Sequence, residues 1–433
     1  MTNEIKKNVE DVDVDEDIER AVNEYRQKLI EFKKEMFNAA DGTLLEVADK
    51  QIIENFEPML KNIQQQMLQK YINKRQNSND YRSCPKCKKK MRHKGRKSFE
   101  FITKAGNINV SGTYYHCDCD NSKSIAVLVS GGRKFSRTAN ELIIRYAAGQ
   151  SYQQASKYLR KDFGIYMSHE MIRTHLSVIS VQIKRIREER NDEYKWDEIK
   201  DSKLYGYVDG VLLNIRKEGW KECKLLRYED EERKNIRHSG LLGSVRDFGL
   251  LARREAVNLG ASAADEIVFL MDGAEGFHNH ISKNFPLARQ IVDYWHVCQH
   301  IGQCSEELYS ADALAANRWR SKYCHMLREF GPDKVLSSLR KVKVRYRSGP
   351  KLRAICGLMS FLIRRLERIN YPELLKAGYR VDSGAIESSC KNVVQSRLKG
   401  VGMRWSRRGA MAMLQVRFAL ASDLWDDVIA KCA

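Results

Sequence analysis

The stretch Leu204-Tyr205-Gly206-Tyr207-Val208-Asp209-Gly210 is an apolar run that ends at an aspartate followed by a glycine. The stretch Ile267-Val268-Phe269-Leu270-Met271-Asp272-Gly273 repeats this pattern. A short apolar run bounded by turn residues is typical of a buried strand. Carboxylates at the ends of neighbouring strands can converge on divalent metal ions. We therefore expect Asp209 and Asp272 to be metal ligands, although an aspartate before a glycine can also be only a turn former.

Around these two runs, the sequence alternates between strand and helix patterns. Further strands are expected at 222–226, 241–245 and 290–294, and helices at 248–259 and 275–284. Three strands followed by alternating helix and strand is the order of a ribonuclease H-like core, which has a mixed sheet with helices on its faces. The first part of this core would span residues 204–300.

Glu387 is a third acid that suits such a site. It lies in the segment 383–390, which indicates the first turn of a helix. Alternatively, it is only an N-terminal helix acid favoured by the helix dipole. Its long separation from Asp272 predicts an all-helical, basic insertion over 301–378, followed by C-terminal helices over 379–433 that complete the core. Three carboxylates holding two Mg²⁺ (or Mn²⁺) ions would suit the cutting and joining of phosphodiesters.

The N-terminal part of the chain divides into a helical region, residues 1–80, and a Cys-pair module, residues 81–131. Cys84 and Cys87 have the two-residue gap of a zinc knuckle, whereas Cys117 and Cys119 are separated by one residue. Two such pairs on β-hairpins predict a zinc-ribbon-like module with a structural Zn²⁺, in which His116 can replace one thiolate. The alternative is a β-hairpin whose thiols bind no metal.

Residues 136–200 are expected to be helical, with helices at 139–148, 152–159 and 168–179. The last two can form a helix-turn-helix that reads DNA through His169, Glu170, Arg173 and His175. A plain helical hairpin is the alternative. The overall fold class is therefore multidomain α+β, with a helical DNA-binding region between the Cys-pair module and the catalytic core.

The amino-acid composition indicates which class of binding partner the protein has. The 433 residues carry 76 Lys and Arg against 56 Asp and Glu, a formal net charge of +20. This excess favours a polyanion, either nucleic acid or an anionic membrane surface. No stretch approaches the apolar length of a membrane span, which favours nucleic acid. An odd number of cysteines, 11, with no secretion signal indicates reduced thiols and a cytoplasmic protein.

The chain from about residue 80 to its end resembles bacterial insertion-sequence transposases of the DDE type, in the Mutator-like branch and its Kra-type group. The resemblance rests on Asp293-Tyr294-Trp295-His296 after the second aspartate, on Trp319 within the basic insertion, and on the motifs 384–391, 397–399 and 402–406. The one-residue gap between Cys117 and Cys119 departs from the family pattern.

The resemblance implies a ribonuclease H-like enzyme that binds the terminal inverted repeats of its element and joins them to target DNA. Asp209, Asp272 and Glu387 would be its metal-binding triad, and Asp293 and His296 an accessory motif. The alternative for that motif is a buried Asp–His hydrogen bond. The residues expected to contact DNA are Arg173, Arg345, Arg404, Trp405 and Arg407, although core packing is the more common role of a lone tryptophan such as Trp405.

Work on two DNA ends implies at least a dimer, associated with the bacterial nucleoid when bound to DNA. Two other functions remain open. One is a catalytically inactive, transposase-derived DNA-binding regulator, and the other is a ribonuclease H-like nuclease.

Overall fold

A computed structural model describes residues 16–40, 42–76, 83–84, 86–119, 123–124, 133–188, 195–422 and 424–432. The chain forms two compact units. The first contains the described residues up to 146 together with 153–169. The second contains residues 147–152 and 170–432. The two units therefore divide the predicted helical segment 136–200 between them.

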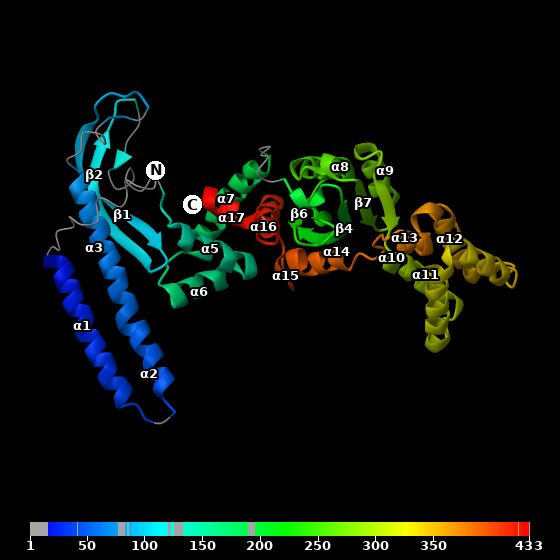
Figure 1. Ribbon diagram of the computed structural model, residues 1–433, viewed down its shortest axis with the longest axis horizontal. Helices are drawn as coiled ribbons and strands as arrows, with labels where there is room; N and C mark the ends of the chain where they lie inside the picture. Colours follow the sequence, from blue (N-terminus) through cyan, green and yellow to red (C-terminus); the bar gives the residue numbers. More distant parts are fainter. Residues whose placement is uncertain are drawn as a thin grey trace. The chain divides into compact units, whose positions relative to one another are not determined.

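The first unit combines a helical arm with a small sheet (Figure 1). Its helices are α1 (Glu16–Phe37), α2 (Leu44–Gln51), a π-helical turn (Ile52–Phe56) and α3 (Glu57–Arg75). Its antiparallel strands, in the order β1-β2-β3, are β1 (Arg92–Thr103), β2 (Gly106–His116) and β3 (Lys123–Ser124). Ile72 of α3 packs against Phe101, Ile108 and Val110 of the sheet. The prediction of helices before residue 80 is confirmed for the described residues.

Three helices follow this sheet in the chain. They are α5 (Arg137–Gly149), α6 (Tyr152–Phe163) and α7 (His169–Glu188). The boundary between the units falls within α5, again after Tyr152, and at the first residue of α7. The three predicted helices are thus confirmed, and α7 continues nine residues beyond its predicted end at 179 because Ile183 and Ile186 remain buried.

The second unit is built on a five-stranded sheet with the order β6-β5-β4-β7-β8. Its strands are β4 (Lys203–Ile215), β5 (Gly219–Glu229), β6 (Ile236–Leu241), β7 (Glu266–Met271) and β8 (Arg289–Val292). The first three pair antiparallel, and β4, β7 and β8 pair in parallel. Parallel strands need a crossover, which α8 (Val245–Asn258) and α9 (Glu275–Asn284) provide.

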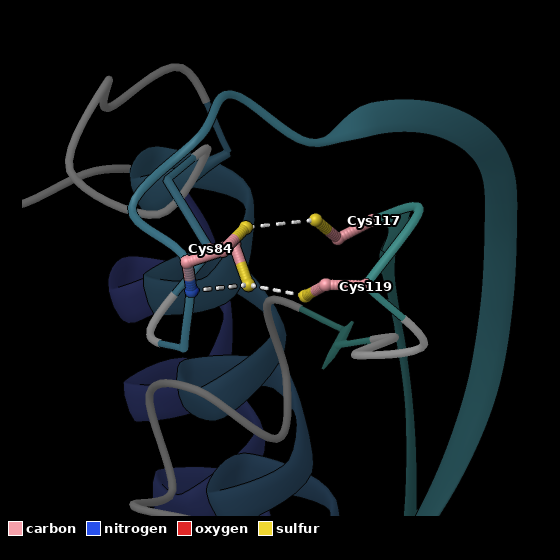
Figure 2. Close-up of side chains that lie close together, drawn as sticks. Cys84, Cys117 and Cys119 are labelled. Carbon is pink, nitrogen blue, oxygen red and sulfur yellow. Dashed lines mark hydrogen bonds between the residues drawn. The ribbon is translucent and has the colours of Figure 1, made fainter.

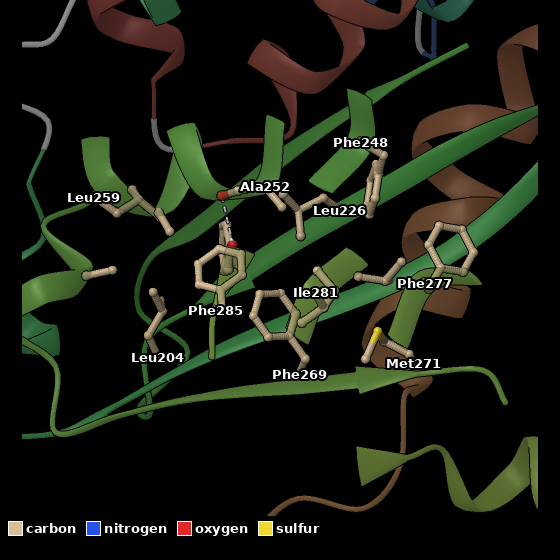
Figure 3. Packing of buried hydrophobic residues seen from close by; sticks show 14 of the residues in the cluster. Leu204, Leu226, Phe248, Ala252, Leu259, Phe269, Met271, Phe277, Ile281 and Phe285 are labelled. Carbon is tan, nitrogen blue, oxygen red and sulfur yellow. Dashed lines mark hydrogen bonds between the residues drawn. The ribbon is translucent and has the colours of Figure 1, made fainter. Parts of the chain in front are cut away.

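The main core lies between this sheet and helices α8 and α9 (Figure 3). Leu204 and Val208 of β4 and Phe269 and Met271 of β7 face these helices. Because side chains alternate along a strand, the odd-numbered positions of β4 and the even-numbered ones of β7 face the opposite side. Aromatic contacts such as Phe248 with Phe277, at 5.5 Å between ring centroids, fill the core.

Helices follow the sheet to the end of the described chain. They are α10 (Tyr294–Leu308), α11 (Ala313–Lys343), α12 (Pro350–Ile363), α13 (Tyr371–Lys376), α14 (Gly384–Ser389), a π-helical segment (Cys390–Gln395), α15 (Ser396–Leu398), α16 (Arg407–Leu420) and α17 (Trp425–Cys432). Short 3₁₀ turns occupy Asp197–Ile199, Ala261–Ala263 and Leu366–Arg368. The helices expected after residue 300 are therefore present. No described helix is both long enough and apolar enough to cross a bilayer.

Three predicted strand positions are wrong. The strand expected at 241–245 is β6, which begins five residues earlier and ends at Leu241. The sequence pattern misses its start because the polar residues His238 and Ser239 are buried and hydrogen-bonded rather than exposed. Tyr294 is the first residue of α10 and not the end of a strand. Asp209 does not end its strand, since β4 continues to Ile215 as a two-stranded ribbon with β5.

Candidate functional site

The strand register brings three aspartates to one level of the sheet. Val208 of β4 is paired with Met271 of β7, which is paired with Val292 of β8. Asp209, Asp272 and Asp293 are the next residues along each chain segment. Val208 and Met271 point into the α8–α9 core, so alternation directs Asp209 and Asp272 to the opposite face. These two carboxylates are therefore neighbours on one face, where the pairing of β4 with β7 ends.

Asp209 is half-buried, and its two carboxylate oxygens have different partners. Oδ1 accepts a hydrogen bond from the Gly210 amide at 2.7 Å, and Oδ2 accepts one from the Cys390 thiol at 3.3 Å. Burial raises the pKa of Asp209, and the charge of Asp272 acts in the same direction. The carboxylate is thus held in a place where a nearby positive charge would stabilise it.

Asp272 follows β7 directly and accepts a hydrogen bond from the Ala274 amide at 3.1 Å. A Cβ atom at Gly273 would lie 2.7 Å from the Phe361 ring of α12, and Arg365 donates to the Gly273 carbonyl. A Cβ atom at Gly210 would likewise collide with Glu222. Neither glycine has a positive φ. Close packing against the buried Phe361 ring requires Gly273, whereas the flexible side chain of Glu222 can move away from a Cβ atom at position 210. The two Asp-Gly pairs therefore do not form turns that need a left-handed residue.

Asp293 and His296 form the buried Asp–His hydrogen bond that the sequence left as one alternative. Asp293 caps α10, and its Oδ2 accepts from the His296 amide at 2.9 Å and bonds to His296 Nδ1 at 2.8 Å. Its Oδ1 accepts from the Ser383 amide at 2.6 Å, just before α14. The Asp293 hydrogen bond raises the pKa of His296, and the charges of Asp209 and Asp272 add to the effect. We call Asp209, Asp272, Asp293 and the helix-borne Glu387 the acidic cluster. The His296 imidazole is thus influenced by acids of this cluster as well as being bonded to the cap of α10.

Glu387 is exposed on α14, where Lys391 donates to its carboxylate at 2.7 Å. Cys390, which donates to Asp209, follows it by three residues, so both side chains share one side of the helix. In this conformation Glu387 is paired with a lysine. The helix that carries it is nevertheless attached directly to Asp209.

Ser389 fixes this helix to the sheet. Its hydroxyl accepts from Arg227 Nη1 at 3.0 Å and bonds to His238 Nε2 at 2.9 Å. Ser389 and His238 are both buried. Sequence reasoning gave no role to Ser389, His238, Arg227 or Cys390. The segment around Glu387 contained two of them, but no local pattern indicates partners on strands far away in the chain.

The four predicted cysteines converge in the first unit (Figure 2). Cys84 Sγ lies 3.4 Å from Cys119 Sγ, and Cys87 Sγ lies 3.3 Å from Cys117 Sγ. Zinc with Zn–S bonds of about 2.3 Å would separate tetrahedral sulfurs by about 3.8 Å, so the cluster needs to open only slightly to hold the ion. Hydrogen bonding from the Cys87 backbone lowers the pKa of Cys84 to about 6, whereas hydrogen bonding with the Cys117 side chain raises the pKa of Cys119 to about 12. Without a metal, Cys84 is therefore the thiol that more readily becomes a thiolate.

This cluster fits a structural zinc and completes four ligands without His116. Among the described residues, it is the one group of three or more His, Cys, Asp or Glu side chains whose ligand atoms lie within 4.8 Å of one another. The carboxylates of Asp209, Asp272 and Glu387 do not meet that distance in this conformation.

The residues predicted to contact DNA have different surroundings. Arg345 and Arg404 are exposed. Arg173 forms an ion pair with Glu170, and Arg407 forms one with Glu218 at 2.6 Å. Their charges are thus partly neutralised.

Trp405 is held by packing. Its amide donates to the Asn214 carbonyl at 3.0 Å, and its indole Nε1 donates to the Leu398 carbonyl at 3.1 Å. The Arg397 guanidinium lies 5.0 Å from the Trp405 ring centroid. Core packing, the second alternative for this residue, therefore describes its surroundings.

Comparisons with known proteins add little to this geometry. No protein-family model matches the sequence, and no curated protein matches it. Among solved structures, the chain is similar to the Drosophila P element transposase strand transfer complex, with a TM-score of 0.29 and 10% identity. The similarity covers 70% of this chain and 83% of that chain. A TM-score of this size does not assign a fold, so function must be inferred from the residues of this chain.

Proposed function

We propose that the protein is a DNA transposase that binds the terminal inverted repeats of its element and catalyses metal-dependent cleavage and strand transfer. One observation carries the proposal. Asp209 and Asp272 share a face at neighbouring strand positions, and the helix bearing Glu387 is bonded to Asp209 through Cys390. Three carboxylates from two strands and a helix form a hard-oxygen site of the kind that phosphodiester chemistry uses.

The sheet supports a ribonuclease H-like catalytic core. Three antiparallel strands are followed by two parallel ones, and the order is β6-β5-β4-β7-β8. The helices α10 to α13 separate β8 from α14 in the chain. This is the arrangement expected of such a core with a helical insertion before its last acidic residue.

The residues present fit Mg²⁺ or Mn²⁺. Asp209 and Asp272 are like charges side by side, and the pKa of Asp209 is raised by burial and by its neighbour. A divalent cation would relieve both effects. Asp209, Asp272 and Glu387 would hold the metal, with Glu387 exchanging its bond to Lys391. When bound, two such ions supply activation of the attacking oxygen and stabilisation of the leaving oxygen.

Other residues of the second unit would orient the site and bind the DNA. Asp293 orients His296 beside the two aspartates. Arg345 and Arg404, which are exposed, would contact the phosphates of duplex DNA. Arg173 and Arg407 would contribute less, because each already pairs with a glutamate, and Trp405 would support the fold beside them. Because two element ends must be joined together, the active form would be at least a dimer.

A strand-transfer assay tests the proposal. Purified protein with Mg²⁺ or Mn²⁺ is mixed with oligonucleotides that carry the element end and with a target plasmid. We expect joined products from the wild type and at least a hundredfold less from Asp272→Asn, the size of loss typical when one charge-stabilising group is removed. Asp265→Asn, at the exposed residue just before the same strand, is the matched control and should retain activity.

Strand transfer by Asp272→Asn at the wild-type level would show that the assigned triad is wrong. Cleavage without joining would indicate a nuclease instead. Metal-independent binding with no cleavage under any cation would indicate a DNA-binding regulator.

A further inference from the structure

The most basic surface of the first unit surrounds the cysteine cluster. We call it the knuckle–β1 surface and define it by eight exposed cations, Lys86, Lys88, Lys89, Lys90, Arg92, Lys94, Arg96 and Lys97. The loop between Cys84 and Met91 carries four of them, and the first half of β1 carries the other four. That half of β1 lies outside the core, because every residue from Arg92 to Ser98 is exposed except Gly95, which is half-buried.

Backbone hydrogen bonds hold together the described part of the loop that carries four of these lysines. The Cys84 amide donates to the Lys89 carbonyl, and the Lys88 amide donates to the Cys84 carbonyl, both at 2.8 Å. Ser83 and Lys90 are joined by a β-bridge. Lys88 has a φ of 60°, a left-handed conformation that turns the chain within the loop. The lysine side chains therefore extend from a backbone organised around the thiols.

Few positive charges of the knuckle–β1 surface are paired with a carboxylate among the described residues. No ion pair with a described residue engages Lys86, Lys88, Lys89, Lys90 or Lys94, whereas Arg92 pairs with Asp118 at 3.0 Å. A cavity of about 320 Å³ beside the thiols is lined by Lys89, Lys90 and Arg92, and Asp118 is the one carboxylate that the described residues contribute to its lining. A zinc ion with four thiolates carries a net charge of −2, which is much smaller than the charge of eight cations. The surface therefore keeps a net positive charge, which favours a polyanionic partner.

We propose that the knuckle–β1 surface binds the phosphate backbone of duplex DNA without reading its sequence. The proposal rests on the proposed function, which requires the protein to hold long duplexes. Lysine side chains suit phosphates as point charges, and a row of them along a loop and a strand can follow a backbone. An anionic membrane is the weaker partner, because residues 86–119, which are all described, place no exposed large apolar side chain that would insert into lipid.

The test compares two fourfold lysine variants of the full-length protein. In the first, Lys86, Lys88, Lys89 and Lys90 are changed to Gln. In the second, the matched control, four exposed lysines on α1, α2 and α3 of the same unit are changed to Gln, namely Lys33, Lys34, Lys50 and Lys74. Both variants have the same reduction in positive charge. Fluorescence anisotropy gives the Kd for a duplex of unrelated sequence across a range of salt concentrations, and elemental analysis gives the zinc content.

We expect the knuckle variant to keep its zinc and to bind at least tenfold more weakly at low salt. Its slope of log K against log salt should fall by about 0.9 for each phosphate that the variant no longer neutralises. The control should change by much less.

The proposal would be overturned if the knuckle variant bound the duplex with the affinity and salt dependence of the wild type. It would also be overturned if the control variant lost as much affinity as the knuckle variant. Selective loss of binding to anionic vesicles, with DNA binding intact, would overturn it in favour of a membrane. The outcome is independent of the catalytic proposal, because Asp272→Asn should bind this duplex as the wild type does. Strand transfer by Asp272→Asn would refute the triad and leave this surface in place.

Discussion

Two histidines of the second unit, His296 and His175, have pKa values shifted in opposite directions by their surroundings. The Asp293 hydrogen bond raises the pKa of His296, so the protonated ring contributes stability below pH 6.5 that is lost as the pH rises through the folded-state pKa. Burial lowers the pKa of His175 from 6.5 to about 4. His175 was one of the side chains expected to read DNA. Its ring is half-buried on α7, and this burial is the cause of the lowered pKa.

His175 gives a pH-dependent prediction. The unfolded chain takes up a proton below about pH 6.5, whereas the folded chain does so only near pH 4, so stability falls as the pH drops through this window. At about pH 5, the loss should be about 2 kcal/mol relative to neutral pH. We expect His175→Gln to remove this part of the pH dependence. Urea unfolding of both proteins at neutral pH and at about pH 5 measures it, and parallel pH profiles would contradict the prediction.

At the scale of elements, α14 shows how distant segments assemble the candidate site. Its docking depends on Ser389, whose hydroxyl bonds to Arg227 of β5 and His238 of β6. Cys390, the next residue, bonds to Asp209 of β4. Three strands therefore set the position of the helix that carries Glu387.

Replacing Ser389 should disturb metal use more than it disturbs folding. We expect Ser389→Ala to destabilise the protein by about 1–3 kcal/mol, because the buried His238 and the half-buried Arg227 each lose a hydrogen bond. The Mg²⁺ concentration for half-maximal strand transfer should rise several-fold. The control is Ser388→Ala, whose exposed hydroxyl bonds only to Asn392 among the described residues. A stability loss with an unchanged Mg²⁺ requirement would mean that Ser389 supports the fold alone.

The elements differ in how well their sequences predict them. The strand ending at Met271 and the helix α9 occur where their patterns indicate, because a buried apolar run and an amphipathic helix are local signals. β6 was misplaced because its buried residues are polar and satisfied by distant partners such as Arg187 and Glu255. The acids Asp209 and Asp272 could be selected from strand patterns. The contacts of Ser389 and Cys390 could not, because they exist only in the folded chain.

At the scale of the whole molecule, the two units separate the two candidate metal centres. The cysteine cluster lies in the first unit, with its own core around Ile72. The acidic cluster lies in the second, beside the core of the five-stranded sheet. Each ion would therefore stabilise a different part of the chain.

Scanning calorimetry of the full-length protein can resolve this separation. A ligand that binds only a folded unit raises the midpoint of that unit's transition. We expect two transitions, one lowered by a zinc-selective chelator and the other raised by Mg²⁺. Cys117→Ser should abolish the response to the chelator and leave the Mg²⁺ response, and Asp272→Asn should do the reverse. A single transition that responds to both treatments would show that the units unfold together. If the second transition did not respond to Mg²⁺, the proposal that the acidic cluster binds this metal would be wrong, whether or not the cysteines bind zinc.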